Sequence, residues 1–455
     1  MTKRTATSLK ARALEPILKD LARTNDGLAR PFPGEREDRQ PVHTVYGGAH
    51  LFKADSAARL GAIASATLDE YATDGATLAR VLGLSSTVDP DLVRARVAAR
   101  LQREAVEDFR IDFEDGYGNR PDEEEDGHAE SAAAEVAAGA EKGTVPPFIG
   151  IRIKPLSREL HGRSLRTLDI FVTALAARTR NRLLPNFVVT IPKVMAPGHV
   201  TAAAAACAML ERRLKLKPGV LRLELMIETP QSILAADGTS ALRGLVAAGR
   251  GRVRAAHFGT YDYTALCGIT ASWQHMRHQA CDFAKQVMQV ALAQSGVQLS
   301  DGATNIMPVP VHRASEGRAL TNQQRRENHE AVHRAWRIHY DDVMHSLENG
   351  FYQGWDLHPA QLPTRYAAVY AFFLSALPAA SARLRNFVEK AAPATLVGDV
   401  FDDAATGQGL LNFFIRGLSS GALTLEEARA TGLSVEELQG RSFLKILEGR
   451  RRRGA

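Results

Sequence analysis

Cysteine is scarce in this sequence, with three residues (Cys207, Cys267 and Cys281) in 455. They form no CxxC pair, which excludes both the disulfide framework of a small secreted domain and a cysteine-rich metal site. The N-terminus lacks the apolar core of a signal peptide, and no apolar run approaches the length that crosses a membrane. We therefore expect a cytoplasmic protein with no membrane partner.

The sequence also lacks the glycine motifs that bind nucleotide phosphates. Neither GxGxxG nor GxxxxGK[ST] is present, which argues against a doubly wound dinucleotide-binding sheet. Charge of one sign is not concentrated either, because acidic and basic residues are interspersed around a net charge of +6. The one dense basic run, Arg450 to Arg453, is more typical of a solvated helix end than of a nucleic-acid tail. We therefore expect no nucleic-acid partner.

Short apolar runs alternate with segments of helical periodicity, which is typical of βα units and a parallel sheet. The predicted strands are Val42–Tyr46, Phe109–Phe113, Phe148–Ile153, Phe187–Ile191, Leu221–Ile227, Ala255–Phe258, Ala303–Val309 and Gly350–Leu357. Eight strands close a barrel, so the predicted fold class is α/β, a (β/α)8 TIM barrel with inserted helices. We expect residues 1–361 to form this barrel with an N-terminal helical lead-in. Residues 362–455 are expected to form a C-terminal helical extension without further strands.

Two segments of the barrel carry extra length. Ala54–Arg103 has room for two or three helices between two strands. Asn119–Gly143 begins with the five acids of Asp122–Asp126. A run of like charge is usually solvated, so we expect an exposed acidic loop that leads into a helix.

Two carboxylates stand at matching strand ends. Glu228 follows the fifth predicted strand, and Asp262 follows the sixth. In a barrel, both project from the same end of the sheet, where catalytic groups gather. One or two carboxylates, with water or substrate as the other ligands, suit Mg²⁺. We therefore predict Glu228 and Asp262 as metal ligands.

The second and third strands end in charged residues. Asp112 and Glu114 share one strand face, and Asp115 lies at the following turn. So many acids repel one another unless a cation stands nearby, so we interpret them as functional rather than as plain salt-bridge partners. Arg152 has the planar fork that binds a substrate carboxylate, and Lys154 lies two residues further on the same face. Either cation can instead be an internal counter-ion.

The remaining candidates are weaker. Lys193, after the fourth strand, is better explained by an ion pair than by Schiff-base chemistry, because nearby acids raise the pKa of an amine. The end of the first strand carries Gly47, Gly48, His50 and Lys53. They either form a substrate-binding site, since glycine lets a ligand approach the backbone, or a structural turn.

The order of these strand-end motifs is similar to that of the HpcH/HpaI aldolase and citrate lyase β-subunit family, in the pyruvate/phosphoenolpyruvate-binding barrel superfamily. The resemblance covers about residues 42 to 365. The motifs are Asp112-Phe113-Glu114-Asp115-Gly116, Arg152, Pro192-Lys193, Glu228-Thr229-Pro230, Gly259-Thr260-Tyr261-Asp262 and His358-Pro359-Ala360-Gln361.

This resemblance implies an enzyme that binds Mg²⁺ or Mn²⁺ and makes or breaks a carbon–carbon bond next to a carbonyl. It matches Glu228 and Asp262 with the metal ligands, and Arg152 with the arginine that steadies the substrate carboxylate. It matches Asp112 and Glu114 with acids that hold metal-bound water. Asp115 stands where the aldolase branch has a catalytic histidine, as in the citrate lyase branch.

In acyl-CoA lyases and malate synthases of the wider superfamily, a C-terminal aspartate is the acid/base, and Asp402 and Asp403 are similar to it. Capping of a helix by Asp402 is the alternative. The leading hypothesis is a Mg²⁺-dependent carbon–carbon lyase that acts on a 2-oxo acid or acyl-thioester through an enolate. The alternatives are a phosphoenolpyruvate-using transferase and a non-catalytic metabolite-binding subunit. Relatives of this kind are usually trimers or hexamers, so a homo-oligomer is expected.

Overall fold

Eight parallel strands form a nearly closed barrel in the computed structural model, which describes residues 8–29, 31–36, 38–314, 318–389, 395–397, 400–402, 404–443, 445–446 and 449–450. The strands are β1 (His43–Gly48), β2 (Asp108–Asp112), β3 (Phe148–Arg152), β4 (Phe187–Ile191), β5 (Arg222–Ile227), β6 (Val253–Phe258), β7 (Gln298–Ser300) and β8 (Gly354–Asp356). They are ordered β7-β6-β5-β4-β3-β2-β1-β8. Two backbone hydrogen bonds close the ring, from Asp301 N to Gln353 O (2.8 Å) and from Trp355 N to Gly302 O (2.9 Å). The fold is therefore the predicted (β/α)8 TIM barrel.

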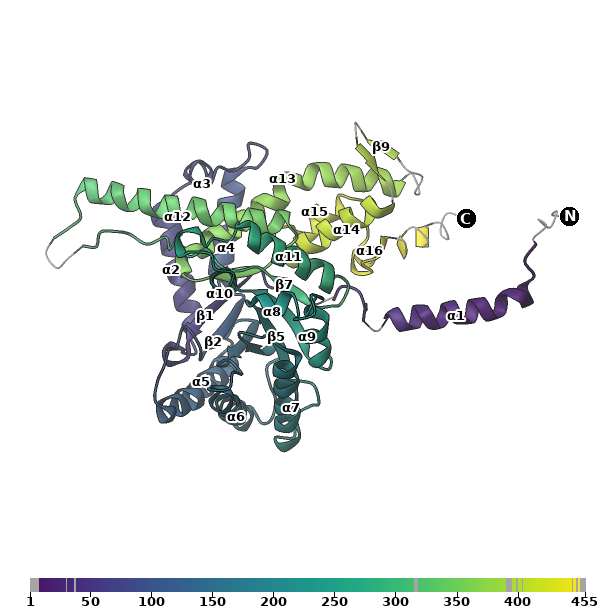
Figure 1. Ribbon diagram of the computed structural model, residues 1–455. Helices are drawn as coiled ribbons and strands as arrows, with labels where there is room; N and C mark the ends of the chain where they lie inside the picture. The colour runs from purple at the N-terminus through teal and green to yellow at the C-terminus, as the bar shows by residue number, and fades with distance from the viewer. Residues whose placement is uncertain are drawn as a thin grey trace.

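Helices connect the strands and cover the outside of the barrel (Figure 1). The helices up to the last strand are α1 (Ala11–Ala29), α2 (Ser56–Tyr71), α3 (Gly75–Leu82), α4 (Pro90–Glu104), α5 (Asp122–Lys142), α6 (His161–Arg178), α7 (Pro197–Arg213), α8 (Pro230–Ile233), α9 (Leu242–Ala248), α10 (Thr260–Leu266), α11 (Gln279–Leu292) and α12 (Asn322–Glu348). Helices α2, α3 and α4 fill the long insertion after β1, as its length predicts.

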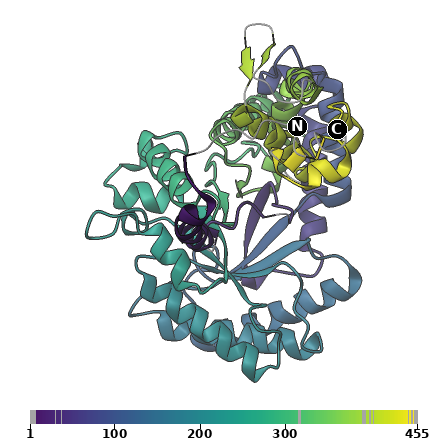
Figure 2. The same ribbon diagram turned by 90° about the vertical axis from the view of Figure 1, so that its right-hand side faces the viewer.

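The C-terminal segment forms a helical unit on one side of the barrel (Figures 1 and 2). It contains α13 (Leu362–Glu389), α14 (Ala404–Ser419), α15 (Leu425–Arg429) and α16 (Val435–Gln439). Arg96 of α4 ties this unit to the barrel through an ion pair with Glu427 of α15 (2.6 Å). Contrary to the expectation of helices alone, the segment also contains a short antiparallel hairpin, β9 (Thr395–Val397) and β10 (Val400–Asp402).

One described helix, Pro359–Phe387, is long and apolar enough by composition to cross a membrane. Half of its most apolar stretch is buried inside the protein. Tyr366, in the part that forms α13, is fully buried, and its hydroxyl donates to the carbonyl of Ala105 at 3.1 Å. The core helix of a soluble protein has the same properties, so this helix is weak evidence for a membrane span.

The seventh strand is not where the sequence pattern places it. The prediction of Ala303–Val309 is wrong, because β7 lies earlier, at Gln298–Ser300, and Ala303 makes only an isolated bridge with Trp355. Pro308 and Pro310 have no backbone N–H to donate, which prevents this segment from pairing further as an inner strand.

The acidic segment before α5 is also different from its prediction. Its acids form the first turn of α5, where negative charge suits the positive end of a helix. Glu125 is fully buried rather than solvated. Between β5 and β6, Leu234 and Ser240 pair as an isolated antiparallel bridge that separates the short helices α8 and α9.

Candidate active site at the carboxyl ends of the strands

The two predicted metal ligands line one cavity at the carboxyl ends of the barrel strands. Glu228 follows β5 directly, and Asp262 lies in the first turn of α10, after β6. The cavity has a volume of about 300 Å³. Its walls come from β1, β2, β3 and β8 and from the segments that follow β2, β5, β6, β7 and β8: Tyr46, Asp112, Asp115, Gly116, Arg152, Glu228, Gly259, Thr260, Tyr261, Asp262, Gly302, Ala303, Trp355 and Leu357.

Glu228 is buried, with 1% of its surface exposed. Burial and the nearby charges of Asp262 and Glu114 raise the pKa of its carboxyl to about 8. Its Oε1 accepts the backbone N–H of Lys193 at 2.6 Å. Gly259 makes room for it, because a Cβ at that position would stand 2.5 Å from the Cβ of Glu228. The position of the Glu228 carboxyl is therefore fixed, but the positive charge around it is too small to keep its pKa low.

Lys193 stands among the acids of the site. Its ammonium contacts Glu114 and lies 3.4 Å from Asp115 and 3.6 Å from Asp262. Burial lowers the pKa of this amine, but the charges of Glu114, Glu228 and Asp115 raise it by more, so the lysine stays charged. The ion-pair interpretation of Lys193 agrees with these contacts.

The backbone of Lys193 adopts φ +49°, a left-handed conformation that is strained for a side chain of this size. This conformation aims its N–H at Glu228 while its side chain reaches Glu114. Lys193 thus contacts Glu228 through its backbone and other acids of the site through its side chain.

Arg152, at the end of β3, is almost fully buried and locked by acids. Its Nε and Nη2 donate to the two oxygens of Asp112 at 2.7 and 2.6 Å, and its Nη1 lies 3.0 Å from Glu114 Oε2. Its guanidinium also lies over the rings of Tyr46 (4.7 Å) and Trp355 (5.9 Å). The arginine is therefore a counter-ion of these acids and also lines the cavity, and its role in binding a substrate stays a prediction.

The acids at the end of β2 differ in their burial and in their hydrogen-bond partners. Asp112 is buried, and besides Arg152 it accepts the backbone N–H groups of Glu114 (3.0 Å) and Gly116 (2.7 Å). Burial raises the pKa of Glu114 although Arg152 lowers it. Asp115 has a side chain that is 62% exposed at the cavity rim. Asp115 is therefore the acid of this strand end that a ligand can reach.

Lys154 belongs to a different cluster. Its ammonium lies 3.1 Å from Glu125 Oε2 and donates to the carbonyl of Phe113 at 2.7 Å. Its ring contact is with Tyr117, at 5.1 Å. Lys154 is an internal counter-ion, and among the described residues it does not line the cavity. Its partner is the buried Glu125, which the sequence interpretation places in a solvated loop.

The four residues predicted at the end of β1 have packing and surface contacts in the structure: Gly47 and Gly48 end β1, His50 lies in the short 3-10 helix Ala49–Leu51, and Lys53 follows that helix. A Cβ on Gly47 would stand 2.7 Å from the ring of Phe109, and a Cβ on Gly48 would collide with the carbonyl of Gly116. His50 packs against Tyr117 at 5.6 Å between ring centroids. Lys53 is half-exposed and lies 3.3 Å from Glu135. The glycines are thus needed for packing, and the described cavity wall includes none of the four residues.

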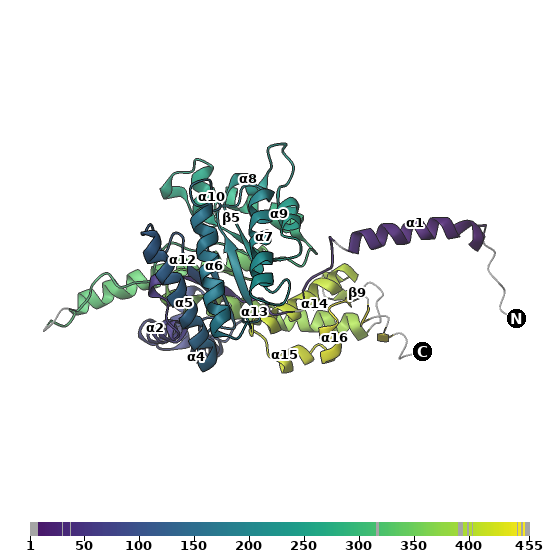
Figure 3. The same ribbon diagram turned by 90° about the horizontal axis from the view of Figure 1, so that it is seen from below.

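The C-terminal aspartates lie on the hairpin or beyond it. Asp402 ends β10, and Asp403 lies outside the described residues. The hairpin projects from the C-terminal helical unit, away from the barrel strands, in all three views (Figures 1, 2 and 3). An acid/base role for either aspartate stays a prediction.

Sequence reasoning missed the aromatic wall of the cavity. The rings of Tyr46 and Trp355 pack at a tilt of 37° with their centroids 4.5 Å apart, and Tyr261 donates its hydroxyl to Ala303 O at 2.8 Å. The sequence interpretation does not place Trp355 at the site. Its position one residue before the end of β8 is the signal that could have placed it at the cavity.

The donor chemistry of the site fits a divalent cation. In the described part of the chain, no group of three or more His, Cys, Asp or Glu side chains is arranged to hold a metal ion. Mg²⁺ does not require one, since it commonly binds one or two carboxylates and completes its shell with water or substrate. Glu228 and Asp262 supply such a pair, and burial together with the charges of Asp262 and Glu114 raises the pKa of the Glu228 carboxyl, an effect that a bound cation would oppose.

The fold and site define a (β/α)8-barrel protein with an acidic cavity at the carboxyl ends of its strands. The chain belongs to the DUF6986 family, a domain of unknown function, whose sequence model matches residues 21–446. No curated protein matches the chain. The membership therefore names a family without naming a reaction, and the finer resemblance to the HpcH/HpaI and citrate lyase β-subunit family stays a prediction.

Solved structures with a similar fold include a citrate lyase from Burkholderia xenovorans LB400, which is 16% identical with a TM-score of 0.55 over 86% of this chain and 96% of that one. CitE from Mycobacterium tuberculosis, in complex with magnesium, acetoacetate and coenzyme A, is 13% identical (TM-score 0.45; 85% and 100% covered). A malate synthase from Haloferax volcanii is 12% identical (TM-score 0.44; 78% and 91% covered). At these identities, the citrate lyase supports the fold alone.

Proposed function

We propose that this protein is a Mg²⁺- or Mn²⁺-dependent carbon–carbon lyase that acts next to the carbonyl of a 2-oxo acid or an acyl-thioester. The observation that carries the proposal is the convergence of Glu228, Asp262 and Arg152 on one cavity. A bound divalent ion polarises a carbonyl and neutralises the charge of an enolate, which is the chemistry that such a bond cleavage needs. Glu228 and Asp262 are the residues that would hold it.

Arg152 is the substrate-binding cation in this proposal. Asp112 and Glu114 hold its guanidinium on three nitrogens, so its orientation is fixed before a substrate arrives. The Tyr46 and Trp355 rings cover it and limit the water around it. A carboxylate or an enolate oxygen then meets a cation that needs no reorganisation. Asp112 and Glu114 have a positioning role here, because their oxygens already bind cations.

Asp115 is the first candidate for the group that moves a proton. Its carboxylate lies on the cavity rim, largely exposed, and its nearest described cation is Lys193 at 3.4 Å. It can therefore reach a substrate without breaking a buried ion pair. We place the activity in the cytoplasm, where the free thiols predicted from the sequence are stable.

Deuterium exchange tests the proposal without knowledge of the natural substrate. An enolate-forming site exchanges the methyl protons of pyruvate or of acetyl-CoA in D₂O, which proton NMR follows. We expect Mg²⁺-dependent exchange with one of these probes, and we expect Glu228→Gln and Asp262→Asn to abolish it. Asp169→Asn, an exposed carboxylate on α6, is the matched control and should exchange normally. Exchange that survives a chelator, or none with either probe, contradicts the proposal.

A further inference from the structure

Helix α1 buries none of its side chains against the described part of its own chain. None of its nineteen residues, all of them described, is buried. The helix projects from the body as a separate rod in Figures 1 and 3, and Figure 2 shows it end-on. Most helices in proteins owe their stability to the packing of an apolar face against other elements rather than to intrinsic helix propensity. The helix therefore needs a surface to cover that face.

An apolar stripe runs along one side of α1. Its large side chains are spaced three, four or seven residues apart: Leu14, Ile17, Leu18, Leu21 and Leu28. Ile17, Leu18, Leu21 and Leu28 are each more than half exposed. Arg12, Lys19 and Arg23 lie on the opposite side by the same periodicity. A continuous exposed stripe of this kind marks a protein or membrane contact.

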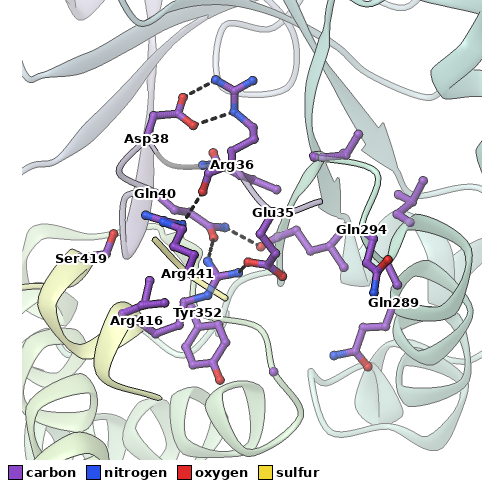
Figure 4. A pocket seen from close by; sticks show the side chains of 18 residues that line it. Glu35, Arg36, Asp38, Gln40, Gln289, Gln294, Tyr352, Arg416, Ser419 and Arg441 are labelled. Carbon is purple, nitrogen blue, oxygen red and sulfur yellow. Dashed lines mark hydrogen bonds and ion pairs between the residues drawn. The ribbon is translucent and has the colours of Figure 1, made fainter. Parts of the chain in front are cut away.

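The segment that follows α1 is fixed to the body. In this strap (residues 31–36 and 38–40), the backbone N–H of Gly34 donates to the carbonyl of Gln294 at 2.9 Å. Gln294 lies just beyond the end of α11. In Figure 4, Arg416 of α14 reaches Glu35 and Gln40 of the strap, and Arg36 pairs with Asp38. Pro31 and Pro33 stiffen the junction with the helix. Helix α1 is thus an arm that leaves the body from beside α11.

The charge of α1 favours a protein partner. The helix carries three basic and three acidic residues: Arg12, Lys19, Arg23, Glu15, Asp20 and Asp26. Helices that bind anionic membranes are rich in Lys and Arg on their polar face, which this helix is not. Its balanced charge suits a neutral protein surface.

The same chain supplies such a surface on α11. The exposed face of that helix is uncharged: it consists of Gln279, Phe283, Gln286 and Val290, with Phe283 50% and Val290 78% exposed. Large exposed apolar side chains without charge between them are unusual on a surface helix. Because the arm leaves beside α11, a reciprocal exchange between two copies brings each arm to the other's α11. Such a two-fold contact is self-complementary and also occurs inside hexamers.

We propose that α1 is an assembly arm whose apolar stripe packs on the Phe283–Val290 face of α11 in a second copy of this chain. Each pair of chains then contains two copies of this contact, and each copy buries the apolar stripe of one α1 and the Phe283–Val290 face of one α11. The interface lies on the outside of the barrel, so this proposal is independent of the chemistry in the cavity.

Light scattering and sedimentation of the full-length protein test the arm. Leu21→Glu and Val290→Glu should each raise the dissociation constant of the pair at least about tenfold, because a charge replaces a buried side chain. Lys19→Gln is the matched control for Leu21→Glu, since it also lowers the net charge by one but lies on the polar side of α1; it should leave the mass unchanged. An unchanged mass in both glutamate variants overturns the proposal.

A crosslink identifies the surface that the arm covers. In a Cys267→Ser background, which removes the exposed thiol, Leu21→Cys combined with Phe283→Cys should form a disulfide between two chains. A disulfide within one chain means that the arm folds back on its own body, and it overturns the assembly. A failure to crosslink, together with loss of assembly in Leu21→Glu but not in Val290→Glu, overturns the assignment to α11.

Discussion

Replacing Glu228 by glutamine should change how the stability of the metal-free protein depends on pH. In the folded protein, burial and neighbouring acids raise the pKa of Glu228 from 4.5 to about 8. The unfolded chain loses this proton near pH 4.5, whereas the folded protein keeps it until about pH 8. Between these values the folded state binds more protons, so the stability that Glu228 contributes falls as pH rises through this window.

The size of the effect follows from the shift. A pKa that rises from 4.5 to about 8 corresponds to about 4 kcal/mol of stability lost by pH 8, where about half of the folded molecules still keep the proton. With an unfolding entropy of about 2 cal/mol/K per residue, this is about 4 °C in the melting temperature of a chain of 455 residues. Glutamine has no proton to lose. The melting temperature of the wild type should therefore fall by about 4 °C relative to Glu228→Gln between pH 5 and pH 8.

Thermal denaturation with a chelator present, followed across this pH range, measures the difference. Saturating Mg²⁺ should restore the wild type and leave Glu228→Gln unchanged, because an ion that binds the folded state stabilises it. Glu135→Gln is a control, since Glu135 lies on the outside of the barrel beside Lys53. If the melting temperatures of the wild type and of Glu228→Gln change with pH in the same way, the pKa of the buried Glu228 carboxyl is not raised and the prediction is wrong.

Three further substitutions test the site. Arg152→Lys removes a bidentate contact, and we expect a rise in KM for an acidic substrate and a kcat lowered by about 10-fold or more; unchanged kinetics would exclude its proposed role. Lys193→Met removes a cation that competes with a metal, so Mn²⁺ should bind about tenfold more tightly by calorimetry, whereas weaker binding would make the lysine a supporting group. Gly259→Ala should destabilise the protein and weaken Mn²⁺ binding through its clash with Glu228, whereas Gly127→Ala, which meets no atom within 4 Å, should do neither.

The strand ends of the site follow from local pattern, and this explains why they could be predicted. An apolar run that ends in an acid places that acid at the carboxyl edge of a parallel barrel, whatever the rest of the chain does. Asp112, Glu228 and Asp262 all reach the predicted cavity for this reason. A strand of three residues such as β7 is too short to show an alternating apolar pattern. The sequence prediction therefore falls on the longer apolar stretch that follows it.

The partners of the charged residues could not be predicted, because they depend on contacts between distant segments. Lys154 and Arg152 are two residues apart in sequence, yet Lys154 pairs with the buried Glu125 and Arg152 with Asp112. Likewise, Gly48 is required by the carbonyl of Gly116, on a different strand end. Sequence spacing sets the side of a strand on which a charge lies but not the distant group that neutralises it.

The barrel interior contains two charged layers, which differ in how their buried carboxyl groups are neutralised. In the lower layer, burial raises the pKa of Glu224, but Arg110 and His257 lower it by more, at distances of 2.7 and 2.9 Å. In the upper layer, Glu228, four residues later, has a raised pKa and too little positive charge around it. The same residue type, equally buried in one segment of chain, is thus neutralised in one layer and not in the other. Because the upper layer also lines the cavity, this contrast supports the proposed cation site there.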